Sequence, residues 1–406
     1  MVINIDSWCE VDHHDLYKYY SDFNDWLESD EGGLFREENY VEALSQPSKA
    51  LFASDKNAYD QAFIKYRNEK RHKVLNDSYF QDQFNGNHWP ERNLDRFMQL
   101  VGYLEEKGVV PFIGAGTSVA GGFPTWEDHL KEQARTANMN EQEINNLLDA
   151  GKYEIVIDKI ESTRGRDTFI QELRDVFSRT GKLADIHLAL TELFTDTLIT
   201  TNYDHLLEQA FDTGAENKTQ IIIGNDVMIA PIANKTTIYK LHGDIRTPAE
   251  CIISKGQYDR AYGGDDLDLT LPIPRLLAYH YKNSNLLFLG SSLNKDRTIK
   301  VFEAVKLGMN DTLLPQHFSL EQAPEQVSEL SDRNSELLSL GITPIWYQKG
   351  QYGFLVDLLR HAMAEINHRK AATLLRNGID TLGASLEQEL VLSNPGIWKR
   401  IKQWWN

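Results

Sequence analysis

Four short stretches of the chain combine glycine or small polar residues with groups that can bind phosphate, hold a sugar or move a proton. They are GAGTS, TTNYD, KLHGDI and FLGSSLNKD, at residues 114–118, 200–204, 240–245 and 288–296. Each follows or ends a run of residues typical of a buried strand. Because ligands bind outside the carboxyl ends of the strands in an open parallel sheet, we expect the four stretches to lie close together.

The first stretch has the composition of a phosphate-binding turn. Gly114 and Gly116 would let a pyrophosphate approach the backbone, and the free N–H groups at the start of a following helix favour negative charge. The third glycine of the dinucleotide fingerprint G-x-G-x-x-G is absent, because Val119 stands at that position. A plain strand-to-helix turn is therefore the alternative interpretation.

The second and third stretches carry polar groups suited to work on a sugar. Asn202 and Asp204 can contact sugar hydroxyls and position a water molecule, although both residue types also favour a turn that caps the next helix. His242 could act as a general base, because an unperturbed histidine has a pKa of about 6.5. A single histidine is more often structural, so both interpretations stay open.

The fourth stretch again passes from a strand to small residues and then to a helix. Gly290, Ser291 and Ser292 could line a ribose or a phosphate. Asp296 could instead be an ordinary acid in the first turn of a helix, where it interacts favourably with the helix dipole.

The elements that must position these residues alternate along the chain. Patterns typical of strands occur at 109–114, 196–201, 219–224, 226–232, 236–243, 285–292, 314–321 and 342–347. Helical patterns separate most of them. This alternation predicts an α/β fold with a Rossmann-like, mostly parallel sheet, covered by helices on both faces.

Composition excludes several classes of function. The chain has 406 residues, 41% of them hydrophobic, with 60 acidic and 42 basic residues and a formal charge of −18. Such a surface repels phosphate backbones, so we expect no direct nucleic-acid binding. Without a signal-peptide pattern or an apolar run of about 18 residues, the sequence predicts a cytoplasmic protein with no membrane contact.

Metal binding is not expected. The two cysteines, Cys9 and Cys251, form neither a disulfide framework nor a C-x-x-C pair for zinc. His13 and His14 are adjacent, and adjacent side chains point apart on a helix, so we interpret them as part of a solvated helix start.

In this order the motifs resemble those of the sirtuin family. The family pattern of GAGxS, a Gly-hydrophobic-Pro step, TQNxD, HG and GxSL corresponds here to residues 114–118, 122–124, 200–204, 242–243 and 290–293. The resemblance covers roughly residues 105–365 and implies a Rossmann-type site for NAD+ as the substrate, with no metal. In it, Asn202 would hold the ribose and order the attacking water, and His242 would be the catalytic base.

The resemblance also implies roles for the other motif residues. The pyrophosphate would be seated by Gly114, Ala115, Gly116 and Ser118, and the sugars would be fixed by Asp204, Ser291 and Ser292 beside Gly290. The loop with Phe123 and Pro124 would lie over the ribose. Thr201 stands where the family has glutamine.

Two departures separate the chain from the sirtuin deacylases. The Phe-Arg pair after the proline step is replaced by Thr125, Trp126 and Glu127, and no zinc cysteines follow His242. The chain looks more similar to the sirtuin-like NADases of bacterial antiphage defence, especially the short type that works beside a HerA-like ATPase. That resemblance implies NAD+ hydrolysis to nicotinamide and ADP-ribose, gated by assembly into a homo-oligomer or with a partner.

Other functions remain open at this stage. The pocket could sense NAD or an ADP-ribose-derived signal without turnover, or the protein could be a deacylase, an ADP-ribosyltransferase or an inactive scaffold for an ATPase. The missing zinc cysteines argue against deacylation. Nothing in the sequence excludes transfer of ADP-ribose to a protein side chain.

The expected domain organisation follows from these patterns. Residues 1–100 would form a helical region for assembly or partner contact, and 101–370 the sirtuin-like NAD-binding domain, with 125–195 as a helical subdomain. Residues 371–406 would form a helical tail. Its Trp398, Trp404 and Trp405 could contact another subunit or protein, or pack on their own domain.

Overall fold

The computed structural model describes residues 7–38, 41–84, 88–212, 218–264, 266–293, 296–309 and 314–393, with 249 and 378–393 described by their backbone alone. The chain divides into two compact units. The larger unit comprises residues 74–360, and the smaller one comprises residues 1–73 together with 361–406. Each unit is described by itself.

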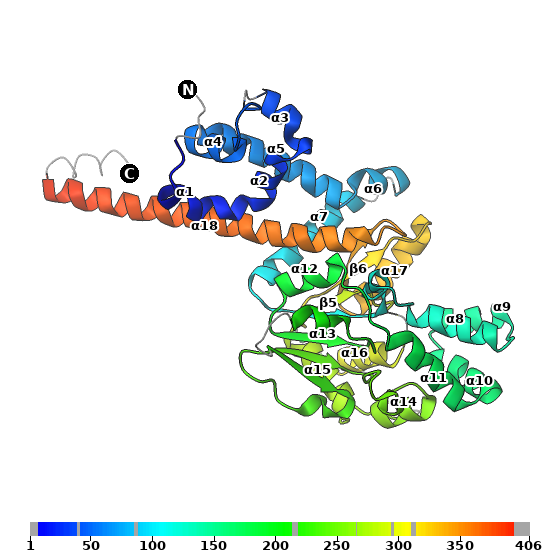
Figure 1. The fold of residues 1–406 in the computed structure, drawn as a ribbon. Helices are drawn as coiled ribbons and strands as arrows, with labels where there is room; N and C mark the ends of the chain where they lie inside the picture. Colours follow the sequence, from blue (N-terminus) through cyan, green and yellow to red (C-terminus); the bar gives the residue numbers. More distant parts are fainter. Residues whose placement is uncertain are drawn as a thin grey trace. The chain divides into compact units, whose positions relative to one another are not determined.

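A seven-stranded sheet forms the centre of the larger unit (Figure 1). Its strands are β1 (Val109–Ile113), β2 (Thr197–Thr200), β3 (Thr219–Ile223), β4 (Thr236–Lys240), β5 (Asn285–Leu289), β6 (His317–Gln322) and β7 (Ile342–Tyr347). Their order across the sheet is β3-β4-β2-β1-β5-β6-β7, and every neighbouring pair is parallel. The strand order reverses direction between β1 and β5, which makes this the switch point of a doubly wound sheet.

The strands are apolar because both faces of the sheet are covered. Four of the five residues of β1 are buried, and so are four of the five in β5. Pairing aligns Phe112 with Phe288 on one side of β1 and Ile113 with Thr200 on the other. Such continuous apolar runs are typical of central parallel strands that pack against helices on two sides.

Helices surround the sheet, with α12 and α13 drawn on one side and α15 and α16 on the other (Figure 1). These helices are α6 (Asp77–Gln83), α7 (Trp89–Glu105), α12 (Asp185–Leu193), α13 (Leu206–Phe211), α14 (Lys255–Tyr262), α15 (Pro272–Asn283), α16 (Arg297–Leu307) and α17 (Val327–Ser339). One apolar cluster joins the sheet to α15, α16 and α17 among these helices, with Phe112, Phe288 and Trp346 from the strands against Tyr281 and Phe302 from α15 and α16.

Four further helices of the larger unit, which we call the helical subdomain, share an apolar cluster with residues that follow β2 and β4. They are α8 (Trp126–Thr136), α9 (Glu141–Asp149), α10 (Tyr153–Arg164) and α11 (Arg166–Phe177). Leu130, Ile157 and Phe169 are fully buried in this cluster. The first two helices begin where side chains accept hydrogen bonds from backbone N–H groups, at Thr125 for α8 and at Asn140 for α9.

The smaller unit is helical and aromatic. It contains α1 (Glu10–Tyr17), α2 (Ser21–Glu28), α3 (Gly33–Glu38), α4 (Pro47–Ser54), α5 (Lys56–Val74) up to residue 73 and α18 (Gly353–Ser393) from residue 361. The fully buried Glu365 of α18 receives hydrogen bonds from Arg67 and Arg71 of α5. Burial raises the pKa of Glu365, but the two guanidinium groups outweigh burial and bring this pKa to about 2.

The structure confirms the expected fold class, a Rossmann-like parallel sheet with surrounding helices and an N-terminal helical region. The prediction of a strand at residues 226–232 is wrong. Residues 226–232 do not pair with the sheet, because Gly224 turns the chain at φ +54° and a 3-10 helix runs over Gly224–Met228. The apolar Met228, Ile229 and Ile232 are consequently exposed.

The remaining expectations concern the N-terminal region, the C-terminal tail and the histidines near the start of the chain. The helices of residues 74–100 belong to the larger unit, whereas the expected N-terminal domain extended to residue 100. Trp398, Trp404 and Trp405 lie outside the described residues. His13 and His14 lie in α1, where His13 Nδ1 accepts from Cys9 N and His14 pairs with Glu10. None of the helices searched in the described part of the chain has the length and apolarity to cross a bilayer.

Candidate active site

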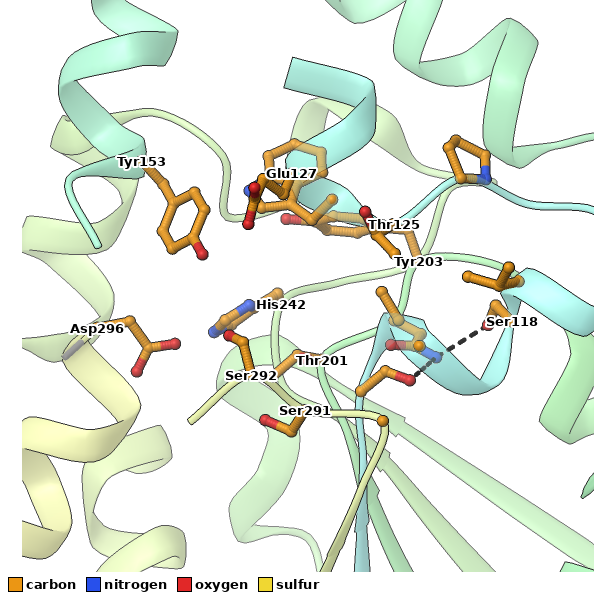
Figure 2. A pocket seen from close by; sticks show the side chains of 18 of the residues that line it. Ser118, Thr125, Glu127, Tyr153, Thr201, Tyr203, His242, Ser291, Ser292 and Asp296 are labelled. Carbon is orange, nitrogen blue, oxygen red and sulfur yellow. Dashed lines mark hydrogen bonds between the residues drawn. The ribbon is translucent and has the colours of Figure 1, made fainter. Parts of the chain in front are cut away.

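A cavity of about 390 Å³ lies at the carboxyl ends of the strands of the larger unit (Figure 2). Its walls come from the loops after β1, β2, β4 and β5, from the end of β6, and from the helical subdomain. It therefore spans the switch point between β1 and β5, where doubly wound sheets bind their ligands.

The structure brings the four motifs together. The expected site residues that line the cavity are Gly114, Ala115, Gly116, Ser118, Pro124, Thr201, Asn202, Asp204, His242, Gly290, Ser291 and Ser292. Phe123 is the exception, because its buried ring stacks on Phe177 in the core of the helical subdomain. The ring of Phe123 therefore faces this apolar cluster and not the cavity, where it was expected to lie over the ribose.

The glycines of the first motif are needed for contact between two loops. A Cβ on Gly114 would lie 2.5 Å from the carbonyl oxygen of Gly290, and one on Gly116 would lie 2.9 Å from Gly290 Cα. Gly116 N also donates to Gly290 O at 2.9 Å. The loops after β1 and β5 therefore pack directly on each other, and a side chain on either glycine would separate them.

The first motif does not lead straight into an α-helix. Two 3-10 turns, Ala115–Thr117 and Val119–Gly121, follow β1, and α8 begins only at Trp126. The expected anion site at a helix start is thus replaced by a short 3-10 segment.

Asn202 is held rigidly at the end of β2. Its backbone N–H donates to Thr200 Oγ1 at 3.0 Å, and the same hydroxyl donates to Ile113 O at 2.8 Å. These bonds tie the β2 loop to the end of β1. Asp204 accepts from Leu206 N at 3.0 Å, so the expected turn that leads into α13 is present as well.

The hydrogen bonds fix which side of the Asn202 amide carries oxygen. Its Nδ2 donates to the carbonyl of Gly114 at 3.1 Å, and a carbonyl can only accept. Nδ2 also donates to Ser118 Oγ at 3.0 Å, because that hydroxyl donates its proton to Asp204 at 2.7 Å. Oδ1 remains, buried and without a hydrogen-bond partner among the residues that the structure describes. A buried unpaired acceptor beside a cavity is suited to a ligand hydroxyl or a water molecule.

The backbone at His242, which follows β4, is held by the segment that contains Cys251 and Ile252. Its carbonyl accepts from Ile252 N at 2.8 Å. Gly243 has a φ of +104°, and a Cβ there would lie 2.8 Å from Cys251 Cα, so the HG pair needs its glycine. Burial lowers the pKa of His242 to about 4, so the imidazole is neutral at pH 7 and can accept a proton.

A buried lysine connects the loops after β2 and β4. Lys240 Nζ donates to Asp204 O at 2.7 Å, to Glu208 at 2.8 Å and to Asp244 at 3.0 Å. His205, Glu208 and Asp244 lie close enough to one another to hold a metal ion, but the Lys240 ammonium and the Arg246 guanidinium already pair with the two acids. No local sequence pattern marks this arrangement, although Lys240 and Asp244 flank His242 in the third motif.

Replacing Lys240 with methionine is expected to destabilise the protein by about 3 kcal/mol, because Glu208 and Asp244 would keep their charges while losing the ammonium. Urea unfolding followed by circular dichroism measures the change. Lys159→Met is the matched control, because Lys159 forms an exposed ion pair with Glu143 and such pairs contribute about 0–1 kcal/mol. Equal stabilities of the two variants would contradict this role of Lys240.

Asp296 lines the cavity and also caps a helix. Its carboxylate accepts from Ile299 N at 3.0 Å, which makes it the N-cap of α16 rather than a first-turn acid. In Figure 2 the carboxylate points into the space that His242 and Tyr153 also face. Burial raises the pKa of Asp296 to about 6, against the lowering effect of the backbone N–H groups.

Sequence reasoning missed several residues of the cavity wall. They include Tyr153, Glu154, Tyr258, Arg297, Lys300 and Glu321. Most belong to helices outside the motifs, so no local pattern marks them. Glu321 is the exception, because it lies at the end of another predicted strand, and the rule used for the four motifs could have found it. Burial raises its pKa to about 7, although Arg333 lies 3.7 Å away.

The fold and the cavity define a doubly wound α/β protein with its ligand site at the switch point. Residues 196–345 match the family described as "SIR2-like domain". The chain is 30% identical to the NAD(+) hydrolase ThsA of Cytobacillus dafuensis over 164 residues, which are 40% of this chain and 32% of that protein. It is 26% identical to the NAD(+) hydrolase ThsA of Acinetobacter baumannii over 209 residues, 52% of this chain and 41% of that protein.

A third relative is the NAD(+) hydrolase ThsA of Bacillus cereus, 30% identical over 159 residues, 39% of this chain and 32% of that protein. The chain thus spans about a third to two fifths of the length of these relatives.

Proposed function

We propose that the protein is a sirtuin-like NAD+ glycohydrolase, which cleaves the nicotinamide–ribose bond to give nicotinamide and ADP-ribose. The observation that carries the proposal is the buried Asn202 Oδ1, which has no partner among the described residues and belongs to the wall of the cavity. A ribose hydroxyl or an attacking water would supply the missing hydrogen bond. The names of the similar proteins support NAD+ as the substrate.

The width of the site suits an extended dinucleotide. His242 follows β4 and Glu321 lies at the end of β6, with β2, β1 and β5 between those strands. Four strand spacings of about 4.8 Å separate β4 from β6, or roughly 19 Å in all. The ribose that bears nicotinamide would lie near Asn202, and the pyrophosphate would cross the paired glycine loops at the switch point.

Cleavage of the nicotinamide–ribose bond needs little help from a general acid. Nicotinamide leaves as a neutral ring from a cationic glycoside, so the site must stabilise an oxocarbenium-like ribose and position a nucleophile. Asn202 Oδ1 holds the ribose and orders the water, and His242 accepts a proton from that water or from a ribose hydroxyl. Asp204, Ser291 and Ser292 fix the sugars, and Gly114, Ala115, Gly116 and Ser118 seat the pyrophosphate. Thr201, Pro124 and Gly290 shape the walls around them.

Release of free nicotinamide on incubation with NAD+ tests this proposal. We expect nicotinamide to accumulate with time, whereas NAD+ that is bound and recovered intact would favour a sensor of NAD or of an ADP-ribose-derived signal. Label from NAD+ that appears on a protein side chain instead of in free ADP-ribose would favour an ADP-ribosyltransferase.

We also propose a biological role in bacterial antiphage defence, in which depletion of NAD+ aborts infection. An ungated NADase would poison its own cell, so activity would depend on assembly as a homo-oligomer or with a partner such as a HerA-like ATPase. The helices of residues 1–100 and the tail at 371–406 are the proposed assembly surfaces. Light scattering that finds only monomers, with and without the ATPase, would count against this gating.

A further inference from the structure

The ring of His242 is held by a residue that belongs to none of the motifs. His242 Nε2 lies 2.8 Å from the hydroxyl of Tyr262, and Nδ1 lies 3.5 Å from the hydroxyl of Tyr258. Tyr258 belongs to the wall of the cavity. Tyr262 is fully buried in the core of the larger unit. The Nε2 edge of the ring therefore faces the core, and the Nδ1 edge faces the cavity.

The backbone fixes Tyr262 at this position. It is the last residue of α14, and the helix stops there because Gly263 takes a φ of +103°. A Cβ at Gly263 would lie 2.4 Å from Asp266 O, so the turn needs glycine. The hydroxyl of Tyr262 also lies 3.5 Å from Thr298 Oγ1, at the start of α16. The Tyr262 hydroxyl thus has two polar neighbours, Nε2 of His242 and the hydroxyl of Thr298.

Proton placement on a neutral histidine decides whether it can act as a base. A neutral imidazole has one nitrogen that donates and one that accepts. If Tyr262 donated to Nε2, Nδ1 would carry the proton and could not take another from the cavity. A base that faces the cavity therefore requires Nε2–H to donate to the Tyr262 oxygen, which leaves Nδ1 bare.

We propose that Tyr262 is the positioning residue of His242: its oxygen accepts from Nε2–H, its own proton is directed to Thr298, and the Nδ1 lone pair is thereby held toward the cavity. This inference rests on the proposed function only for its kinetic consequence. The tautomer itself is a property of the free protein.

A phenol beside His242 affects the basicity of the imidazole differently from a carboxylate in the same place. Burial raises the pKa of Tyr262, so the phenol stays neutral and adds no negative charge beside the imidazole. A neutral acceptor orients the ring without adding a charge that would raise the pKa of His242, which burial lowers to about 4.

Long-range ¹H–¹⁵N correlation spectra of the full-length protein, labelled with ¹⁵N-histidine and free of NAD+, test the tautomer. Comparison with His242→Gln identifies the signals of His242. We expect a protonated Nε2 and an unprotonated Nδ1 at pH 7, and a mixture of tautomers in Tyr262→Phe. A protonated Nδ1 in the wild-type protein would overturn the proposal, whatever the variants do.

The kinetic test uses the same substitution with a matched control. Tyr262→Phe is expected to lower kcat about tenfold or more while KM changes by less than about threefold, because the substrate does not touch this phenol. Tyr281→Phe removes another fully buried hydroxyl, which bonds to the backbone oxygen of Leu340 outside the cavity wall, and should keep kcat. An unchanged kcat in Tyr262→Phe, or equal losses in both variants, would contradict a positioning role.

The outcomes separate this inference from the proposed function. Absence of nicotinamide release together with the expected tautomer would refute the function and leave the placement of the proton intact. Nicotinamide release with Nδ1 protonated would refute the inference alone. If Tyr262→Phe does not fold, Thr298→Val leaves the phenol in place. It should still raise the population of the His242 tautomer that is protonated at Nδ1.

Discussion

Replacement of Asn202 by alanine is expected to lower kcat/KM for NAD+ hydrolysis by about 100- to 1,000-fold, the usual effect of removing one group that stabilises a transition state. The reason lies in the Oδ1 atom, which is buried without a partner among the described residues, while Nδ2 is fully used by Gly114 and Ser118. The amide donor thus holds the residue in place, and the amide oxygen is left for the substrate. Nicotinamide release under conditions where wild-type turnover is linear gives the measurement.

Asn93→Ala provides a matched control for this substitution. Asn93 is also fully buried and forms two hydrogen bonds, both with the backbone of Trp346 outside the cavity wall. Its loss should lower stability but leave the activity of each folded molecule intact. If the purified, folded Asn202→Ala protein keeps wild-type activity, Asn202 has no catalytic role.

Replacement of His242 by glutamine is expected to lower kcat by about 100- to 10,000-fold, the range for loss of a general base. Glutamine can still bond to Tyr262 but accepts no proton at neutral pH, so NAD+ binding should change much less than turnover. Isothermal titration with NAD+ and a nicotinamide assay together separate the two effects. His280→Gln is the control, since His280 is a buried histidine of α15 that bonds to Ser284.

The pH profile gives a second result for His242. Because burial lowers the pKa of His242 to about 4, the base form is present throughout the neutral range. The part of the activity that depends on His242 should fall only as the pH approaches 4, where protonation removes the lone pair, and not near the ordinary histidine value of about 6.5. A loss of kcat/KM centred near pH 6.5 that disappears in His242→Gln would contradict this result, because it would show that the His242 side chain is more exposed to solvent than in this structure.

Much of the fold and of the site could be predicted from the sequence because strands and motifs are local. The apolar run of β1 and the glycines that follow it are visible within ten residues, and the carboxyl-end rule then places Asn202, His242 and Ser291 on the same cavity. Their convergence needed only parallel strands, since a parallel sheet puts all these ends at one edge.

Features that depend on tertiary packing could not be predicted in this way. Phe123 belongs to the expected loop motif, yet its ring turns into the subdomain core against Phe177. Tyr262 contacts His242 from the end of a helix 20 residues later in the chain. The partners of Lys240 lie in the loop after β2, in α13 and in the loop after β4. Residues 226–232 have the composition of a strand, but the turn at Gly224 removes them from the sheet.

A single-turnover experiment tests the central claim most directly. The purified full-length protein, in excess over NAD+ so that slow turnover does not hide the chemistry, is quenched at intervals and its nucleotides are separated. Cleavage of the nicotinamide–ribose bond predicts that nicotinamide and ADP-ribose appear in equal amounts, and that both appear about 100- to 1,000-fold more slowly with Asn202→Ala. NAD+ that binds to the wild-type protein and is recovered intact would contradict the account.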